Sequence, residues 1–156
     1  MGWTLRIVGD GPERESLEAL VRSLDISDTV EFTSSVSDVE THYREASIFC
    51  LSSRYEGFLM VLLEAISFGL PVVSFDCDTG PAEVLEGTGG KLVGQGNVEE
   101  LVEELLSLMD SPEERLEISA LSQKKAKLYQ PDNILGQWVQ VISDITTCSV
   151  SSTSDK

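Results

Sequence analysis

Short apolar runs alternate along this chain with segments in which apolar residues recur at the spacing of a helix face. These runs predict strands at residues 3–8, 29–32, 47–51, 71–75 and 90–93. The third of them is continuous and apolar, which is typical of a strand in a parallel sheet covered on both faces. Helical spacing, capping residues and a closing glycine predict helices at residues 17–24, 37–46, 59–68 and 82–86.

Strands that alternate with helices predict an α/β fold, with a three-layer, Rossmann-like open parallel sheet of about five strands and right-handed crossovers. The chain after residue 93 is predicted to be helical, ending with a helix over residues 131–145 whose apolar positions are Ile134, Leu135, Trp138 and Ile142. We therefore expect one domain at residues 1–145. The small, polar residues 146–156 are expected to form a disordered tail.

The charge of the chain limits its partners. It has 11 Lys and Arg against 27 Asp and Glu, which gives a net charge of −16 with the single histidine neutral. Such a field repels a phosphate backbone, so we expect no nucleic-acid partner and no adhesion to anionic membrane. No stretch approaches the ~20 apolar residues of a membrane span, and the three distant cysteines suggest neither disulfides nor zinc. A cytoplasmic protein fits these features best.

Candidate chemistry is expected at one edge of the sheet, because ligands of open parallel sheets bind beyond the carboxyl ends of the strands. The segments that follow the predicted strands there are residues 9–12, 33–36, 52–58 and 76–81.

The predicted helix at residues 59–68 is apolar on nearly all sides, and Glu64 is its only charged residue. Such a helix is buried, so Glu64 must lose water, which costs several kcal/mol unless hydrogen-bond donors meet the carboxylate. A vicinal diol such as a ribose is one suitable partner. Pairing with an arginine, or contact with water at the helix edge, is an equally open alternative.

The loop before this helix carries a second carboxylate, Glu56, followed by Gly57, which permits close approach of a ligand to the backbone. Free amides and the positive dipole end in the first turn of a helix suit a phosphate. Two carboxylates beside such a helix end suit a ligand that combines phosphate with hydroxyls. A sugar nucleotide is a ligand of this kind.

These segments also resemble a known family. Glu56-Gly57-Phe58, followed by Leu62-Leu63-Glu64-Ala65 and Gly69-Leu70-Pro71-Val72-Val73, is similar to the E-x7-E signature of retaining glycosyltransferases with the GT-B fold. Residues 7–12 and 79–83 also resemble segments of that family, the glycosyl transferases of group 1, which includes bacterial lipopolysaccharide and capsule enzymes. The resemblance covers about residues 3–142 and implies the C-terminal, donor-nucleotide domain.

The resemblance implies a role for each matching residue. Glu64 would hold the ribose hydroxyls of a nucleotide-diphosphate sugar, and Glu56 would contact hydroxyls of the transferred sugar as the catalytic residue. No metal or cofactor is implied beyond the donor itself. The donor-binding residues implied by the resemblance are Gly9, Gly11, Thr33, Ser34, Ser35, Val36, Gly57, Phe58, Leu59, Glu64 and Gly80.

The chain also departs from the family pattern. Leu59 stands where the family usually has proline, and Ser67-Phe68 stands where it has two small residues, so Phe68 implies local repacking. The family's acceptor domain, its first strand in this domain and a loop with an arginine and a lysine would precede residue 1. Because that strand is central, we predict that this chain's first and third strands pair directly, in the order 2-1-3-4-5.

Two other classes stay open. Asp10, Asp76 and Asp78 at strand ends would suit a magnesium-dependent phosphotransfer or receiver-like domain, although no lysine follows to complete that site and Glu64 is left unexplained. An inactive nucleotide-binding module is the third reading. The turn at residues 9–12 is a weak phosphate-loop signal, since it lacks the third glycine of a dinucleotide fingerprint and the lysine of a P-loop.

Overall fold

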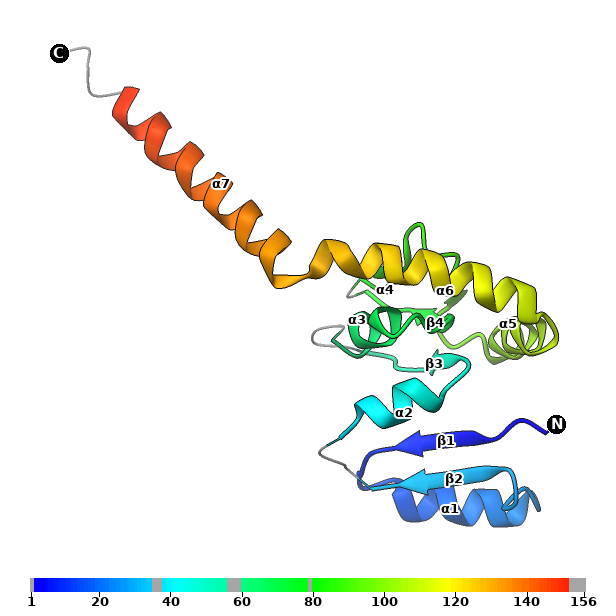
Figure 1. Cartoon of the computed structure of the whole chain (residues 1–156). Coiled ribbons are helices and arrows are strands. Elements are labelled where there is room, and N and C mark those ends of the chain that lie inside the picture. Colours follow the sequence, from blue (N-terminus) through cyan, green and yellow to red (C-terminus); the bar gives the residue numbers. More distant parts are fainter. Residues whose placement is uncertain (1, 35–37, 56–59, 79, 152–156) are drawn as a thin grey trace. The chain divides into compact units, whose positions relative to one another are not determined.

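The strands pair in parallel and a helix lies in each crossover between paired strands, as the alternating pattern predicts (Figure 1). This computed structural model describes residues 2–34, 38–55, 60–78 and 80–151, with side chains through residue 146. Its strands begin one or two residues later than predicted. They are β1 (Leu5–Val8), β2 (Val30–Thr33), β3 (Phe49–Leu51), β4 (Val72–Asp76) and β5 (Lys91–Gly94).

The predicted helices are all present, with shifted ends. They are α1 (Arg14–Ser23), α2 (Glu40–Glu45), α3 (Met60–Ser67), α4 (Pro81–Leu85), α5 (Val98–Asp110), α6 (Pro112–Ala126) and α7 (Pro131–Ser151), with a 3₁₀ turn, η1 (Lys127–Tyr129), between the last two. The chain divides into two compact units, residues 1–42 and 43–156.

The predicted strand order is correct within each unit. The described strands form two parallel sheets, in which β1 pairs with β2, and β4 lies between β3 and β5. The predicted pairing of β1 with β3 would join the two units, and it stays a prediction.

Strand β4 forms the centre of the second unit and is buried along Val72–Phe75. Successive residues of a strand point to opposite faces, and here each face meets its own core. Val72 packs with apolar residues of α3 and α4, whereas Val73 and Phe75 pack with α5 and α6. Helices therefore cover both faces of this sheet, which is why β4 is mostly apolar, and its one buried polar side chain, Ser74, donates to the main-chain oxygen of Phe75.

Gly69 ends α3 in a left-handed conformation, with φ at +74°. A Cβ atom added there would lie 2.7 Å from both Gln123 Nε2 and Ser119 Oγ on α6. We expect Gly69→Ala to lower the free energy of unfolding by about 1–2 kcal/mol, because an L residue is strained at positive φ and the α3–α6 contact is tight. Urea denaturation measures this change.

Gly136→Ala in α7 is the matched control for this prediction. A Cβ atom at Gly136 meets nothing within 4 Å. Alanine in an open helix position is expected to stabilise the protein slightly, by up to about 1 kcal/mol. Equal destabilisation by the two substitutions would show that the backbone conformation and packing at Gly69 are not responsible.

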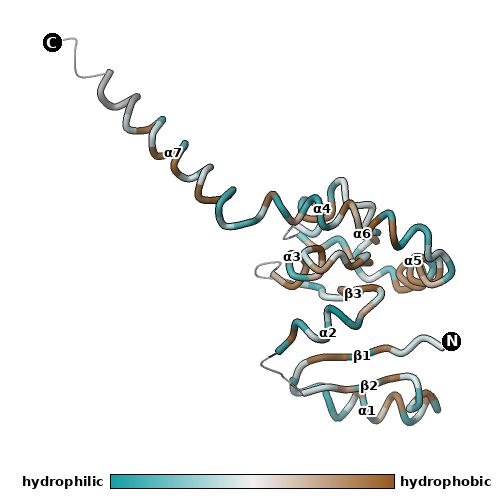
Figure 2. Tube along the Cα trace, in the orientation of Figure 1, coloured by the Kyte–Doolittle hydropathy of each residue, from teal (hydrophilic) through white to brown (hydrophobic). Residues whose placement is uncertain are grey.

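Helix α7 continues to Ser151, past residue 145 where we predicted that order ends. After Gly136 the sequence has no glycine or proline to stop a helix, and serine and threonine only weaken it. Residues 152–156 lie outside the described residues. The apolar positions of α7 are also less buried than predicted, since Leu135, Trp138 and Ile142 are exposed. Figure 2 shows apolar residues repeating along this helix.

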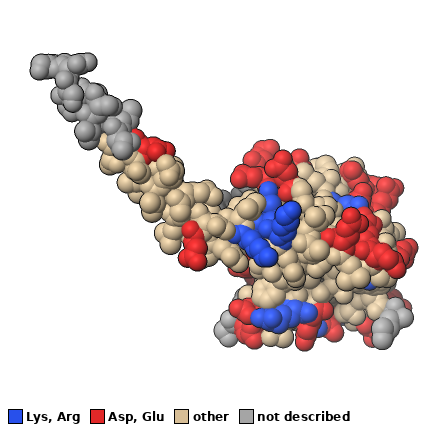
Figure 3. Space-filling model, turned by 45° about the horizontal axis from the view of Figure 1, so that its top comes forward, with Lys and Arg blue, Asp and Glu red and all other residues tan. Residues whose placement is uncertain are grey.

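Acidic side chains are spread over the face of the molecule in Figure 3, and basic ones gather in a few places. Several ion pairs among the described residues join different elements. Lys91 of β5, for example, lies 2.7 Å from Glu114 of α6 and 3.6 Å from Glu104 of α5. Lys91 therefore has a structural role, since its ion pairs join β5 to α5 and α6.

Candidate functional site

Glu64 lies in α3, the apolar helix whose Leu62, Ala65 and Ile66 are buried. Its side chain is half-buried, and its Oε2 accepts a hydrogen bond of 2.9 Å from the hydroxyl of Tyr43 on α2. The described residues include no arginine or lysine paired with it. The carboxylate is therefore compensated by a neutral hydroxyl at one oxygen, and Oε1 stays open to a further donor.

Tyr43 is buried, with 7% of its surface exposed. Burial, together with the hydrogen bond to Glu64 and the charge of that residue, raises the pKa of Tyr43 far above its usual value. The phenol therefore stays protonated and donates to Glu64 throughout the physiological range. Sequence reasoning missed Tyr43, because nothing in the local pattern shows that α2 and α3 meet at this point.

Glu56, Gly57, Phe58 and Leu59 lie outside the described residues, so the structure does not test their predicted roles. The loop after β3, which leads to these residues, makes a hydrogen bond to another loop. The side chain of Gln95, in the turn after β5, donates to the main-chain oxygen of Arg54 over 2.6 Å. This contact joins the loop after β3 to the loop after β5 at the carboxyl ends of the strands, as the topology predicts.

In the first unit, the predicted loops after β1 and β2 lie side by side. The Gly9 amide donates to the main-chain oxygen of Thr33 over 2.9 Å, and Gly9 has a φ of +132°. Gly11 accepts from the amide of Arg14 at the start of α1. Of the other residues predicted in this pair of loops, Ser34 is described, while Ser35 and Val36 are not.

Arg14 joins these two loops and was not predicted. Its guanidinium lies 2.9 Å from Asp10 and 3.3 Å from the hydroxyl of Ser34, and also reaches the main-chain oxygens of Gly9 and Phe32. The hydrogen bond to Glu18, one turn along α1, is the largest cause that raises the pKa of Arg14. The spacing of Asp10, Arg14 and Glu18 at one helical turn is the sequence signal for it.

We expect Arg14→Ala to speed hydrogen exchange at the Gly9 amide by about tenfold, because local opening is easier when the loops lose their shared donor. Amide exchange followed by NMR measures this effect. Arg22→Ala, on the last turn of the same helix, is the control and should leave Gly9 unchanged. Unchanged exchange in Arg14→Ala would contradict a role of Arg14 in joining the loops.

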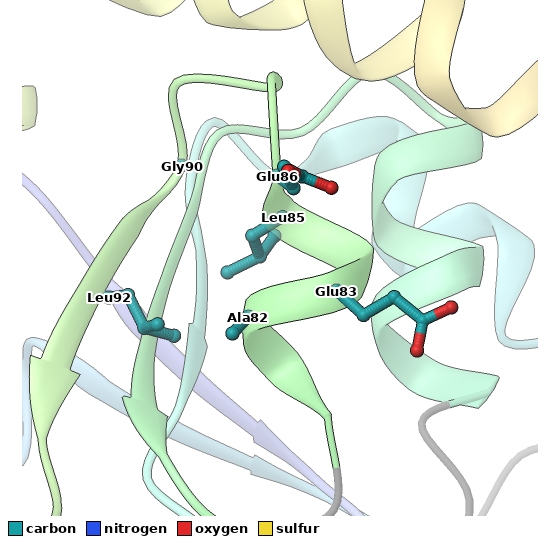
Figure 4. A pocket seen from close by; sticks show the side chains of 6 residues that line it. All are labelled: Ala82, Glu83, Leu85, Glu86, Gly90 and Leu92. Atoms are coloured by element: carbon teal, nitrogen blue, oxygen red, sulfur yellow. The ribbon is translucent and has the colours of Figure 1, made fainter.

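Gly80 has a φ of +99° and stands at the start of α4. Beside α4 lies an open hollow of about 530 Å³, lined by Ala82, Glu83, Leu85, Glu86, Gly90 and Leu92. Figure 4 shows Leu85 between α4 and the strand that carries Leu92, with the Glu83 carboxylate on the other side of the helix. This lining is apolar and acidic, so the hollow does not suit a phosphate.

The described residues contain no group of three acidic, histidine or cysteine side chains placed to hold a metal ion. The Asp10 carboxylate, which the phosphotransfer reading needs for magnesium, is paired with Arg14 at 2.9 Å. The described geometry therefore gives the phosphotransfer reading no support.

The family model for glycosyl transferases group 1 matches residues 2–125, most of the chain. The chain belongs to this family. The resemblance read from Glu56, Glu64 and the segments around them is thereby confirmed, as is the Rossmann-like α/β class.

Individual relatives and solved structures agree with this assignment. The chain is 39% identical over 141 residues to an uncharacterized glycosyltransferase of Haemophilus influenzae, covering 90% of this chain and 40% of that protein. It superposes on the lipopolysaccharide outer core galactosyltransferase WaaB, in its apo form, with a TM-score of 0.79 and 25% identity. The match covers 91% of this chain and 41% of WaaB.

Anabaena HepE, solved in complex with UDP-glucose, has the same fold. Its TM-score is 0.79 at 23% identity, over 90% of this chain and 41% of HepE. HepE and the two proteins above are each matched over about two fifths of their length. No helix among the described residues of this chain is long and apolar enough to cross a membrane.

Proposed function

We propose that this chain binds the nucleotide-diphosphate sugar donor of a retaining glycosyltransferase, and that Glu64 holds the ribose of the donor. One observation carries the proposal. Glu64 is the only charged residue of a buried helix, and a neutral hydroxyl occupies one of its two carboxylate oxygens. A half-buried carboxylate needs more than one donor, and the two adjacent hydroxyls of a ribose supply them.

The family and its solved members support the choice of ligand. HepE was solved with UDP-glucose, which makes a uridine diphosphate sugar the first donor to test. WaaB is a lipopolysaccharide galactosyltransferase. We therefore assign the whole protein to the synthesis of a bacterial polysaccharide or lipopolysaccharide, with a glycan or lipid-linked acceptor and a cytoplasmic location.

In the proposed reaction, the bond between the anomeric carbon and the diphosphate oxygen breaks, and a bond to the acceptor oxygen forms on the same face of the sugar. The nucleoside diphosphate leaves with the electron pair of the broken bond, and its departing oxygen takes the proton that the acceptor hydroxyl loses. Glu56 would contact the hydroxyls of the transferred sugar. The amides of Gly57, Phe58 and Leu59 would stabilise the charge that develops on the diphosphate.

The remaining roles are also proposals. Thr33, Ser34, Ser35 and Val36 would contact the base, and the glycines Gly9, Gly11 and Gly80 would permit close approach of the donor. Because the chain spans about two fifths of its relatives, we assign the acceptor site to another part of the whole protein. A chain of this extent is expected to bind donor weakly and to transfer no sugar alone.

A titration of the full chain with UDP and GDP sugars, followed by amide chemical shifts, tests this proposal. We expect shifts centred on α3 around Glu64, with further shifts at residues 33–36 if these contact the base. A response to magnesium alone, at Asp10 and Asp76, would replace the proposal with phosphotransfer. If neither the nucleotides nor magnesium changed any amide chemical shift, the chain would be an inactive module.

A further inference from the structure

We propose that Tyr43 is a positioning residue for Glu64, and that it fixes the carboxylate in the orientation that receives the ribose of the donor. The inference rests on the proposed function and adds to it a residue that acts through Glu64. Its starting point is the 2.9 Å hydrogen bond from the Tyr43 hydroxyl to Glu64 Oε2. The two residues are on different helices, α2 and α3, so this bond also fixes one helix against the other.

The ring of Tyr43 is held on two sides. It stacks on Phe68 with ring centroids 5.4 Å apart and an angle of 12° between the planes. Phe49 of β3 packs against it at 5.9 Å and 42°. A buried ring held by two others has little rotational freedom, so its hydroxyl has a defined position.

Phe68 is the residue at which this chain departs from the small residues usual in the family. In this structure the Phe68 ring stacks on Tyr43 and packs against the core around α3. The guanidinium of Arg44 lies over Phe68, 5.1 Å from the ring centroid. Arg44 and Tyr43 therefore both contact the Phe68 ring, which supports the tyrosine that donates to Glu64.

The chemistry of the pair favours positioning over a purely structural bond. A carboxylate rotates about its own side-chain bonds unless a partner holds one oxygen. With Oε2 held by Tyr43, Oε1 and the free lone pair of Oε2 keep fixed directions toward a ligand. Preorganisation of this kind raises affinity because less rotational freedom is lost on binding.

Paired titrations of the full chain with UDP and with 2′,3′-dideoxy-UDP, followed by NMR, test this role. Tyr43→Phe keeps the ring and its stacking and removes only the hydroxyl. We expect this variant to bind UDP about tenfold more weakly, since a hydrogen bond to a charged group is lost. Binding of the dideoxy nucleotide, which has no ribose hydroxyls for Glu64, should not change.

Tyr129→Phe is the matched control, because it removes a phenol from η1 outside the Glu64 cluster, and it should bind both nucleotides as the unmodified chain does. In a Glu64→Ala background, Tyr43→Phe should have no further effect on UDP binding. Equal weakening of UDP and dideoxy-UDP binding by Tyr43→Phe would show a structural role and overturn this inference alone. Failure of the unmodified chain to bind any nucleotide would overturn both the inference and the proposed function.

Discussion

Glu64→Ala is expected to weaken UDP binding by about a hundredfold, because the ribose loses a charged acceptor for its two hydroxyls. The substitution removes the only ionised side chain of α3, and the apolar contacts of Leu62, Ala65 and Ile66 stay in place. Binding curves from NMR titration give the two dissociation constants. A thermal unfolding curve of the variant checks that α3 remains folded.

Glu103→Ala is the control for Glu64→Ala. Glu103 is exposed on α5, and its substitution removes the same unit of charge from the protein as Glu64→Ala does. A general electrostatic effect on an anionic ligand would therefore appear equally in both variants. We expect this control to bind UDP as the unmodified chain does. Equal affinity of Glu64→Ala and the unmodified chain would remove Glu64 from the donor site.

Leu62→Ala is expected to lower the free energy of unfolding by about 3 kcal/mol, the usual cost when a fully buried leucine leaves a cavity. Leu62 has no exposed surface and packs in the core shared by α3, α4 and the start of β4. The same helix carries Glu64, so the variant should also lose nucleotide binding as α3 loosens. Urea denaturation measures the loss of stability.

Met60→Ala offers a comparison within the same helix. Met60 is 50% exposed, so its truncation is expected to cost well under the Leu62 value, about 0.5 kcal/mol or less. Similar losses in the two variants would contradict the burial of α3 on the Leu62 side. The burial of α3 supports the role proposed for Glu64, because a carboxylate on a buried helix needs hydrogen-bond donors.

The elements of the second unit could be predicted because local pattern and burial agree there. The run that became β4 is mostly apolar because both of its faces are covered. The near absence of polar residues in α3 reflects its contacts with α6 and β4. The buried character of the helix around Glu64 was therefore visible in the sequence. This helix ends at Ser67, one residue before the predicted end, and its predicted first residue, Leu59, lies outside the described residues.

The partner of Glu64 could not be predicted, because Tyr43 is on another helix and sequence spacing does not say which helices pack together. The hydrogen bonds from Arg14 to Phe32 and Ser34 could not be predicted either, because they depend on the register between β1 and β2. The direct pairing of β1 with β3 rests on the strand order that the resemblance implies, and it would join the two units, so it stays a prediction.

A crystal structure of the full chain with UDP bound tests the central claim most directly. We predict a Glu64 carboxylate oxygen within about 2.5–2.8 Å of a ribose hydroxyl, the length usual for a hydroxyl that donates to a carboxylate. The Tyr43 hydroxyl should still donate to Oε2 in that complex. A bound UDP whose ribose lies away from α3, with Glu64 contacting Tyr43 alone, would contradict the account.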